Sequence, residues 1–148
     1  MPFDNPNTHL SKSDFLLYLD APLHLWAAKH GQADLTPSEF DQHMMRQGYE
    51  VESLAKAWLE GYALQAAQGE VLLWQNTYED GQFIVRTDEL VYRPGSDCYD
   101  LYEIKSSTSL SKDHLYDITY QLLVLESSLR SSGSFCYTLT GTMSVVQS

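Results

Sequence analysis

The sequence predicts a mixed α/β domain in which helices precede and follow a group of three strands. Apolar residues recur at helical spacing in residues 51–59 and again after residue 113, whereas residues 71–106 are rich in β-favouring residues and turn signals. A chain of 148 residues with 43% hydrophobic residues can bury roughly 70% of its unfolded surface around one core. The order helices, three strands, helix, strand favours an α/β sandwich, with an antiparallel meander and a helix that crosses over to a fourth strand.

The first 34 residues are predicted to form an N-terminal helical segment. Ser11 or Ser13 can cap a helix that continues until Gly31. Pro22 lies inside this pattern. Because proline lacks the backbone N–H that a helix needs, we expect a kink or a break into two short helices.

A further helix is predicted to begin at Thr36-Pro37-Ser38-Glu39, which has the form of a capping box with proline at the first helical position. An apolar stripe along this helix predicts the side on which it is buried. The stripe consists of Val51, Leu54, Ala55, Trp58 and Leu59.

Three strands are predicted at residues 71–78, 83–92 and 99–106, separated by turns at Glu79-Asp80-Gly81 and at residues 94–97. A crossover helix is then predicted from Asp113 to the stop signal Ser131-Ser132-Gly133, followed by a fourth strand at residues 135–139. The predicted apolar face of that helix consists of Leu115, Ile118, Leu122, Leu125 and Leu129.

These elements predict one domain, residues 1–148, with its core at residues 36–141 and an irregular tail at residues 142–148. The tail lacks the amphipathic pattern that we expect to close such a domain. We therefore expect the chain to be a truncated or altered form of a longer protein.

The formal net charge of -11 and the pI of about 4.6 argue against nucleic-acid binding by bulk electrostatics alone. Clustered acids are nevertheless what a metal-dependent nuclease needs, because bound divalent ions reverse the local field. No apolar run is long enough to span a membrane, and no signal peptide is recognisable, so we expect a cytoplasmic protein without a membrane partner. Cys98 and Cys136 lack the spacing of a zinc site and are expected to be reduced.

The second and third predicted strands form a hairpin with an unusual charge pattern. If residues 94–97 form the turn, Asp88 lies opposite Glu103, and Arg86 lies opposite Lys105. Like charges across a strand pair are destabilising. A divalent cation between the two carboxylates, with Lys105 near a phosphate, would relieve both conflicts. The alternative is a solvated strand face whose charges have no function.

Asp88, followed fifteen positions later by Glu103-Ile104-Lys105, resembles the signature of the PD-(D/E)XK nuclease superfamily. The fold of that superfamily, the restriction-endonuclease-like core, has the element order predicted above. Two further features resemble its RecB-type branch. One is the opening LSKSDFLLYLDAPLHLWAAKHG, and the other is Gly48 followed four residues later by Glu52.

The resemblance implies roles for individual residues. Asp88, Glu103 and Glu52 would bind the metal together with the backbone carbonyl of Ile104. Lys105 would position or polarise the attacking water, and Gln121 resembles the glutamine that the branch uses beside this lysine. Leu125 stands where the branch usually has a tyrosine. Arg86 and Lys112 are the expected nucleic-acid contacts.

The implied cofactor is Mg²⁺ or Mn²⁺. No iron–sulfur cluster is expected, because Ala21-Pro22 replaces the usual cysteine before proline and there is no terminal cysteine cluster. The resemblance implies a RecB-type exonuclease or DNA end-processing domain that hydrolyses DNA phosphodiester bonds in DNA repair. Its partners would be single-stranded DNA or duplex ends, and further domains or subunits of a larger nuclease. The alternatives are an inactive nucleic-acid-binding or assembly module with the same fold, and an acidic interaction domain whose hairpin match is coincidental.

Overall fold

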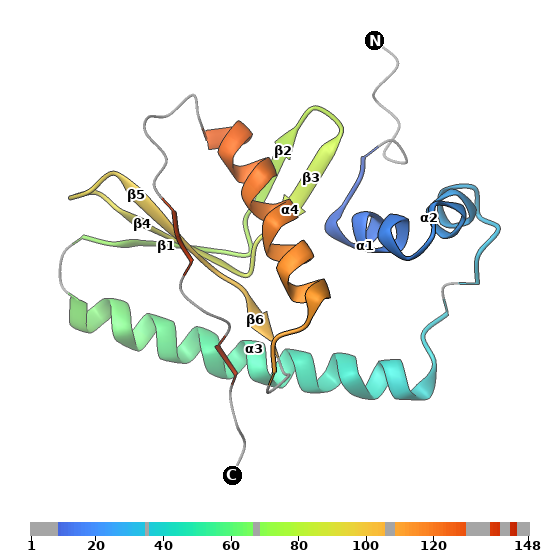
Figure 1. Cartoon of the computed structure of the whole chain (residues 1–148). Helices are drawn as coiled ribbons and strands as arrows, with labels where there is room; N and C mark the ends of the chain where they lie inside the picture. The colour runs from blue at the N-terminus through green and yellow to red at the C-terminus, as the bar shows by residue number, and fades with distance from the viewer. Residues whose placement is uncertain are drawn as a thin grey trace.

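A computed structural model describes residues 9–34, 36–66, 69–105, 109–129, 137–139 and 143–144. The helices are α1 (Lys12–Asp20), α2 (Pro22–Lys29), α3 (Glu39–Ala66) and α4 (Lys112–Leu129). The strands are β1 (Val71–Trp74), β2 (Thr77–Asp80), β3 (Phe83–Arg86), β4 (Glu89–Arg93), β5 (Cys98–Tyr102), β6 (Ile104–Lys105), β7 (Tyr137–Leu139) and β8 (Met143–Ser144). The long helix α3 and the helix α4 lie on either side of the strands (Figure 1). No described helix is long and apolar enough to cross a membrane.

The N-terminal helices follow the predicted break. Ser11 caps α1, and its hydroxyl and backbone exchange hydrogen bonds with Asp14 in a capping box. Ala21 is extended, with φ -159°, and Pro22 opens α2. Gly31, with φ 66°, follows α2 in the left-handed region that glycine tolerates best.

The start of α3 differs from the prediction. Ser38 and Asp41 form the reciprocal cap, with Ser38 N donating to Asp41 Oδ2 at 3.0 Å and Asp41 N donating to Ser38 Oγ at 3.1 Å. The predicted box at Thr36 is therefore wrong by two residues. Both frames offer a hydroxyl and a carboxylate three residues apart, and the observed frame leaves Pro37 outside the helix, where its missing N–H costs nothing.

The buried face of α3 is narrower than the predicted stripe. Val51, Ala55 and Leu59 are 7%, 0% and 2% exposed, whereas Leu54 and Trp58 are 49% and 54% exposed. Residues four apart stay on one helix face, but the residue before each of them is rotated by about 100°. The side chains of Leu54 and Trp58 therefore point away from the sheet.

The central sheet has the strand order β1-β4-β5-β7. β1, β4 and β5 are antiparallel neighbours, and β7 pairs in parallel with β5 after the chain passes through α4. The predicted meander, crossover helix and fourth strand are thus present. Arg93 lies opposite Cys98, which confirms the predicted turn at residues 94–97.

The two long predicted strands at residues 71–78 and 83–92 are each divided by a bend at the same level. Gln75, with φ 50°, turns the first, and Thr87 and Asp88 turn the second. Backbone bonds from Gln75 N to Asp88 O (2.9 Å) and from Thr87 N to Asn76 O (3.1 Å) continue the pairing through the bend. One long hairpin is therefore folded sharply, and its outer part, β2–β3, turns away from β5. Among the described strands, β3 pairs with β2 and β6 pairs with β8, so the predicted pairing of Arg86 with Lys105 is wrong.

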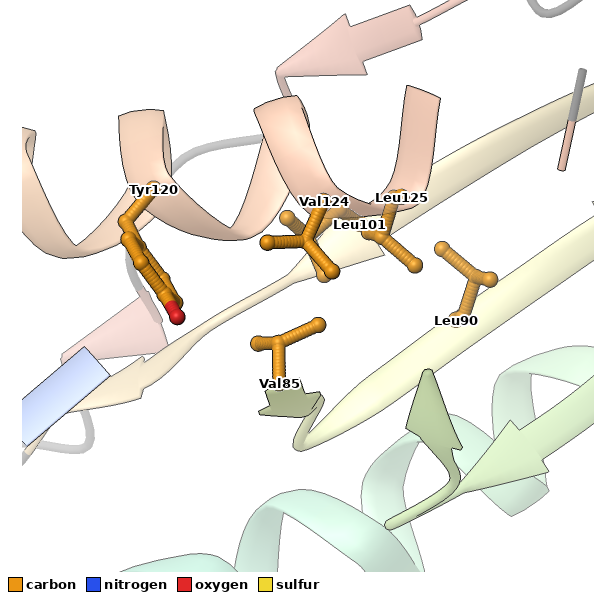
Figure 2. Close-up of a cluster of buried hydrophobic side chains, with 6 residues drawn as sticks. All are labelled: Val85, Leu90, Leu101, Tyr120, Val124 and Leu125. Atoms are coloured by element: carbon orange, nitrogen blue, oxygen red, sulfur yellow. The ribbon is translucent and has the colours of Figure 1, made fainter. Parts of the chain in front are cut away.

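Two apolar clusters hold the layers together. On one side of the sheet, six buried residues from strands and α4 pack together, namely Val85, Leu90, Leu101, Tyr120, Val124 and Leu125 (Figure 2). On the other side, Leu59 of α3 packs against Val91 and Tyr102. Leu90 and Val91 thus point to opposite helices, as strand alternation requires.

The predicted face of α4 is confirmed in part, because Leu125 is buried and Leu122 and Leu129 pack against the same cluster, but the most buried face is rotated from the predicted one. Leu115 is 57% exposed, whereas Tyr120 and Val124 are buried. The difference arises because two polar residues, Asp117 and Gln121, share the inward face. Those two residues belong to the polar cluster described below.

The end of the chain contains a strand that the sequence did not indicate. β8, within the expected irregular tail, pairs in parallel with β6. The third predicted strand, at residues 99–106, is divided into β5 and β6 at Glu103. Ser106, Cys136 and the predicted stop Ser131-Ser132-Gly133 lie outside the described residues.

Candidate metal centre

A cavity of about 530 Å³ gathers four of the eight predicted site residues. Glu52 of α3, Asp88 at the hairpin bend, and Ile104 and Lys105 of β6 all line it. Lys12 of α1, which was not among the predicted site residues, lines it too. Side chains separated by up to 93 positions in the chain thus share one wall.

Local structure explains how the strand residues reach the cavity. Glu103 directly follows β5, and its hydrogen bond with Gln121 places its side chain on the side of the sheet that α4 covers. Asp88 lies in the bend between β3 and β4. The hairpin bend ends the β4 ladder at Glu89. Asp88 therefore lies at the end of the sheet, where β3 no longer covers it.

Asp88 is held by the backbone of β6. Its Oδ2 accepts a hydrogen bond from the Ile104 N–H at 2.8 Å. Burial and the neighbouring Glu103 charge nevertheless raise the pKa of Asp88 to about 6, because they outweigh this bond and the attraction of Lys12 and Lys105. The two predicted carboxylates are therefore close enough to repel each other. Ile104, predicted as a carbonyl ligand, contacts Asp88 through its amide.

Glu103 is 3% exposed and is surrounded by donors. Its Oε1 accepts from Lys105 Nζ at 2.5 Å and from Lys12 Nζ at 3.0 Å. Its Oε2 accepts from Gln121 Nε2 at 2.7 Å. The predicted neighbours Lys105 and Gln121 thus both contact Glu103 directly.

Asp117 is a site residue that the sequence interpretation missed. Its Oδ2 accepts from Lys105 Nζ at 2.6 Å, and its Oδ1 accepts from Gln121 Nε2 at 2.9 Å. Burial alone would raise the pKa of Asp117, but Lys12 and Lys105 outweigh it and hold the pKa below its usual range. Because Asp117 precedes Gln121 by one helical turn, its position on the face of Gln121 could have been found from the sequence.

Lys12 is the second missed residue. Beyond Glu103 it also contacts Asp117, with 3.4 Å between Nζ and Oδ1. Two residues earlier, Leu10 is bound to the edge of β3, with Leu10 N donating to Gln82 O at 2.7 Å and Ile84 N donating to Leu10 O at 3.0 Å. This attachment directs the start of α1 toward the cavity. No local pattern could have shown it, because Lys12 and Glu103 are 91 residues apart.

Both lysines remain charged in this setting. Burial lowers the pKa of each ammonium group, but the attraction of Glu103 and Asp117 outweighs burial and raises both pKa values. A positively charged Lys105 is suited to contact an anionic phosphate or developing negative charge.

The remaining predicted residues lie at the edge of the site or outside it. Glu52 Oε1 accepts from Gln75 Nε2, and Gln75 Oε1 accepts from Arg86 Nη2, so Arg86 reaches Glu52 only through Gln75. Lys112 is exposed at the first residue of α4. Leu125, in place of the expected tyrosine, is 0% exposed and belongs to the apolar cluster under α4.

Comparisons with known proteins do not assign the chain to a family. No family model, curated protein or solved structure matches it. The function must therefore be argued from the site itself.

The donor chemistry around the cavity fits a hard divalent cation. Carboxylate oxygens are the donors that Mg²⁺ and Mn²⁺ prefer, and Glu52 and Asp88 present two carboxylates to one cavity. In addition, the buried Oε1 of Gln121 accepts no hydrogen bond from the described residues. Over the same residues, however, no three His, Cys, Asp or Glu side chains form a ready metal-binding group. Glu103 and Asp117 are held by lysines, and Glu52 is held by Gln75.

Proposed function

We propose that this protein is a metal-dependent nuclease that hydrolyses DNA phosphodiester bonds. The proposal rests mainly on one observation: Glu52, Asp88, Ile104 and Lys105, which come from three separate elements, line one cavity. These are four of the six residues to which the resemblance to PD-(D/E)XK nucleases assigns roles. The other two, Glu103 and Gln121, are hydrogen-bonded to each other, and Glu103 also contacts Lys105. The strand order of the central sheet and its crossover helix match the element order that the resemblance implies, and this supports a restriction-endonuclease-like fold.

Each residue has a role that its surroundings support. Glu52, Asp88 and Glu103 would hold Mg²⁺ or Mn²⁺, which would polarise the phosphate and lower the pKa of the attacking water. The Lys105 ammonium, fixed between Glu103 and Asp117, would stabilise the negative charge that develops on the phosphate. Gln121 donates to the same two acids and would keep Lys105 in position.

The test is cleavage of labelled single-stranded and duplex DNA in Mg²⁺ or Mn²⁺. We expect divalent-dependent hydrolysis by the wild type, and a loss of at least about 10²-fold in Asp88→Asn, which keeps the side-chain shape but removes the charge. Glu50→Gln, an exposed carboxylate on α3, is the matched control and should cleave normally. Equal activity in Asp88→Asn and the wild type would disprove the proposal.

A second candidate is an inactive nucleic-acid-binding or assembly module with the same fold. It is favoured by the two lysine contacts of Glu103, which neutralise one of the three carboxylates that would hold the metal. This candidate predicts that DNA is bound without any turnover. The same assays, combined with a binding measurement, distinguish the two functions.

A further inference from the structure

Lys12 and Lys105 contact the same carboxylate oxygen. Lys105 Nζ lies 2.5 Å from Glu103 Oε1, and Lys12 Nζ lies 3.0 Å from it. Each lysine also contacts Asp117, and again the distance is shorter for Lys105. Lys105 Nζ lies 2.6 Å from Asp117 Oδ2, and Lys12 Nζ lies 3.4 Å from Asp117 Oδ1. Two ammonium groups on one oxygen repel each other, and Lys12 is the more loosely held of the two.

The way each lysine is attached to the fold makes Lys12 easier to displace. Lys105 belongs to β6, which is paired with β8, and its ammonium contacts Glu103 and Asp117 at shorter distances than that of Lys12 does. Lys12 is the first residue of α1, and its side chain is 28% exposed at the wall of the cavity. Its ammonium can therefore move from Glu103 into the cavity without any rearrangement of the sheet.

The charges around the cavity are unbalanced. The carboxylates of Glu52 and Asp88 line it together with Lys12 and Lys105, and the two ammonium groups are already paired with two further carboxylates, those of Glu103 and Asp117. Both ammonium groups contact Glu103 and Asp117, while the hydrogen bond described for Asp88 comes from a neutral amide. A cation bound beside Asp88 would compensate this excess, and the neighbouring carboxylate of Glu103 could share it.

Resting on the proposed function, we propose that Lys12 is a built-in counter-ion that competes with a divalent cation for Glu103 Oε1. Lys12 neutralises Glu103 and Asp117, and it leaves Glu103 Oε1 when a divalent cation binds there. Lys12 thereby weakens metal binding. Lys105 keeps its place between the two acids in either case.

The experiment is calorimetric titration of the full chain with Mn²⁺, with no DNA present. Lys12→Gln removes the competing charge and keeps a polar side chain of similar reach. We expect it to bind Mn²⁺ about tenfold more tightly than the wild type, because a unit positive charge a few ångströms from the ion opposes binding. If the Gln variant does not fold, Lys12→Met, which keeps the aliphatic stem, gives the same comparison.

The matched control is Lys29→Gln. Lys29 also forms a partly buried ion pair in the N-terminal helices, with 2.8 Å between its Nζ and Asp14 Oδ2, but it does not line the cavity. We expect its Mn²⁺ affinity to equal that of the wild type. A gain as large as that of the Lys12 variant would mean that overall charge, and not competition at Glu103, sets the affinity, and would overturn the inference.

The remaining outcomes separate this inference from the proposed function. If the wild type binds Mn²⁺ and Lys12→Gln binds it equally or more weakly, Lys12 is not a competitor and only this inference fails. If none of the proteins binds Mn²⁺, the proposed metal-dependent function fails, and this inference fails with it.

Discussion

The surroundings of Lys105 favour a role in catalysis over a role in DNA binding. Its ammonium is fixed by two buried acids, Glu103 and Asp117, whereas Lys112 extends from the exposed start of α4. Both were predicted to face nucleic acid, Lys105 at the chemistry and Lys112 at the backbone. Only Lys105 lines the cavity.

We therefore expect the two lysines to affect different kinetic quantities, Lys105 the turnover and Lys112 the binding of DNA. Lys105→Ala should lower kcat by about 10² to 10⁴-fold, because an interaction made mainly in the transition state affects turnover. Lys112→Ala should leave kcat unchanged and weaken DNA binding by a few-fold, as loss of one phosphate contact does. Steady-state kinetics on one DNA substrate measure both effects. An unchanged kcat in Lys105→Ala would mean that the Lys105 charge has a structural role and no catalytic one.

Glu89 provides a second prediction at the scale of one residue. Its side chain is 2% exposed on the α3 side of the sheet, and its Oε1 has no hydrogen-bond partner among the described residues. Burial and the charge of Glu60 raise the pKa of Glu89 to about 7, against the opposing effects of the Leu73 backbone and Lys56. The folded protein therefore holds this proton at a pH where the unfolded chain has released it.

The sign of the effect on stability follows directly. Between about pH 4.5 and pH 7 the folded state binds more protons, so this group makes stability fall as pH rises through that window. Glu89→Gln should remove the effect, and its stability relative to the wild type should rise by up to about 3 kcal/mol from pH 5 to pH 8. Urea unfolding at both pH values measures this difference. A constant difference would show that Glu89 is not the titrating group.

At the scale of elements, α4 contributes both to the core and to the polar site. Val124 and Leu125 pack on the sheet, while Gln121 and Asp117, one and two turns earlier, hold Glu103 and Lys105. A weaker contact between α4 and the sheet should therefore affect stability first and site geometry second.

Leu90, which is 0% exposed beneath α4, tests this contact. We expect Leu90→Ala to lower the free energy of unfolding by about 2 to 5 kcal/mol, since truncation leaves a cavity in a packed cluster. Leu123→Ala is the matched control, because Leu123 belongs to α4, the helix that covers Leu90, but is 63% exposed. It should change stability by less than about 0.5 kcal/mol. Denaturant unfolding compares them. Similar losses in both variants would contradict the assigned core.

The elements also show why prediction from the sequence succeeded in part. The break at Pro22 and the turn at residues 94–97 depend on local chemistry, and both were predicted correctly. The bends at Gln75 and Thr87 carry no glycine or proline signal, so two strands were predicted as continuous where four are present. The buried polar face of α4 was missed because periodicity analysis follows apolar residues, whereas Asp117 and Gln121 are buried by their charged partners.

At the scale of the whole molecule, the candidate site joins distant parts of the chain. Asp88, Glu103 and Lys105 could be selected from the hairpin pattern, and Glu52 from its spacing to Gly48. Lys12 could not be selected, because only the packing of Leu10 against β3 brings α1 to the site. When only tertiary contacts bring residues together, no recognisable spacing in the sequence identifies them.

A cation that binds only the folded protein should stabilise all of it. We expect Mg²⁺ and Mn²⁺ to raise the melting temperature, by about 5 to 10 °C at a hundredfold excess over Kd, where the gain is about 2.7 kcal/mol. Asp88→Asn should abolish the rise. The reference is the same protein in buffer without divalent cations. Thermal unfolding followed by circular dichroism measures it. A wild-type melting curve that does not respond to millimolar Mn²⁺ would speak against the metal centre.

The hydrogen bond from the Ile104 amide to Asp88 makes one backbone group a natural probe of the site. An amide proton that points at a carboxylate changes its magnetic resonance frequency when that carboxylate gains a proton or a ligand. In a ¹⁵N-labelled sample, the Ile104 signal should therefore move with a midpoint near the Asp88 pKa of about 6. The chain thus contains its own spectroscopic reporter, which requires no attached label and reads protonation and ligand binding at a single atom.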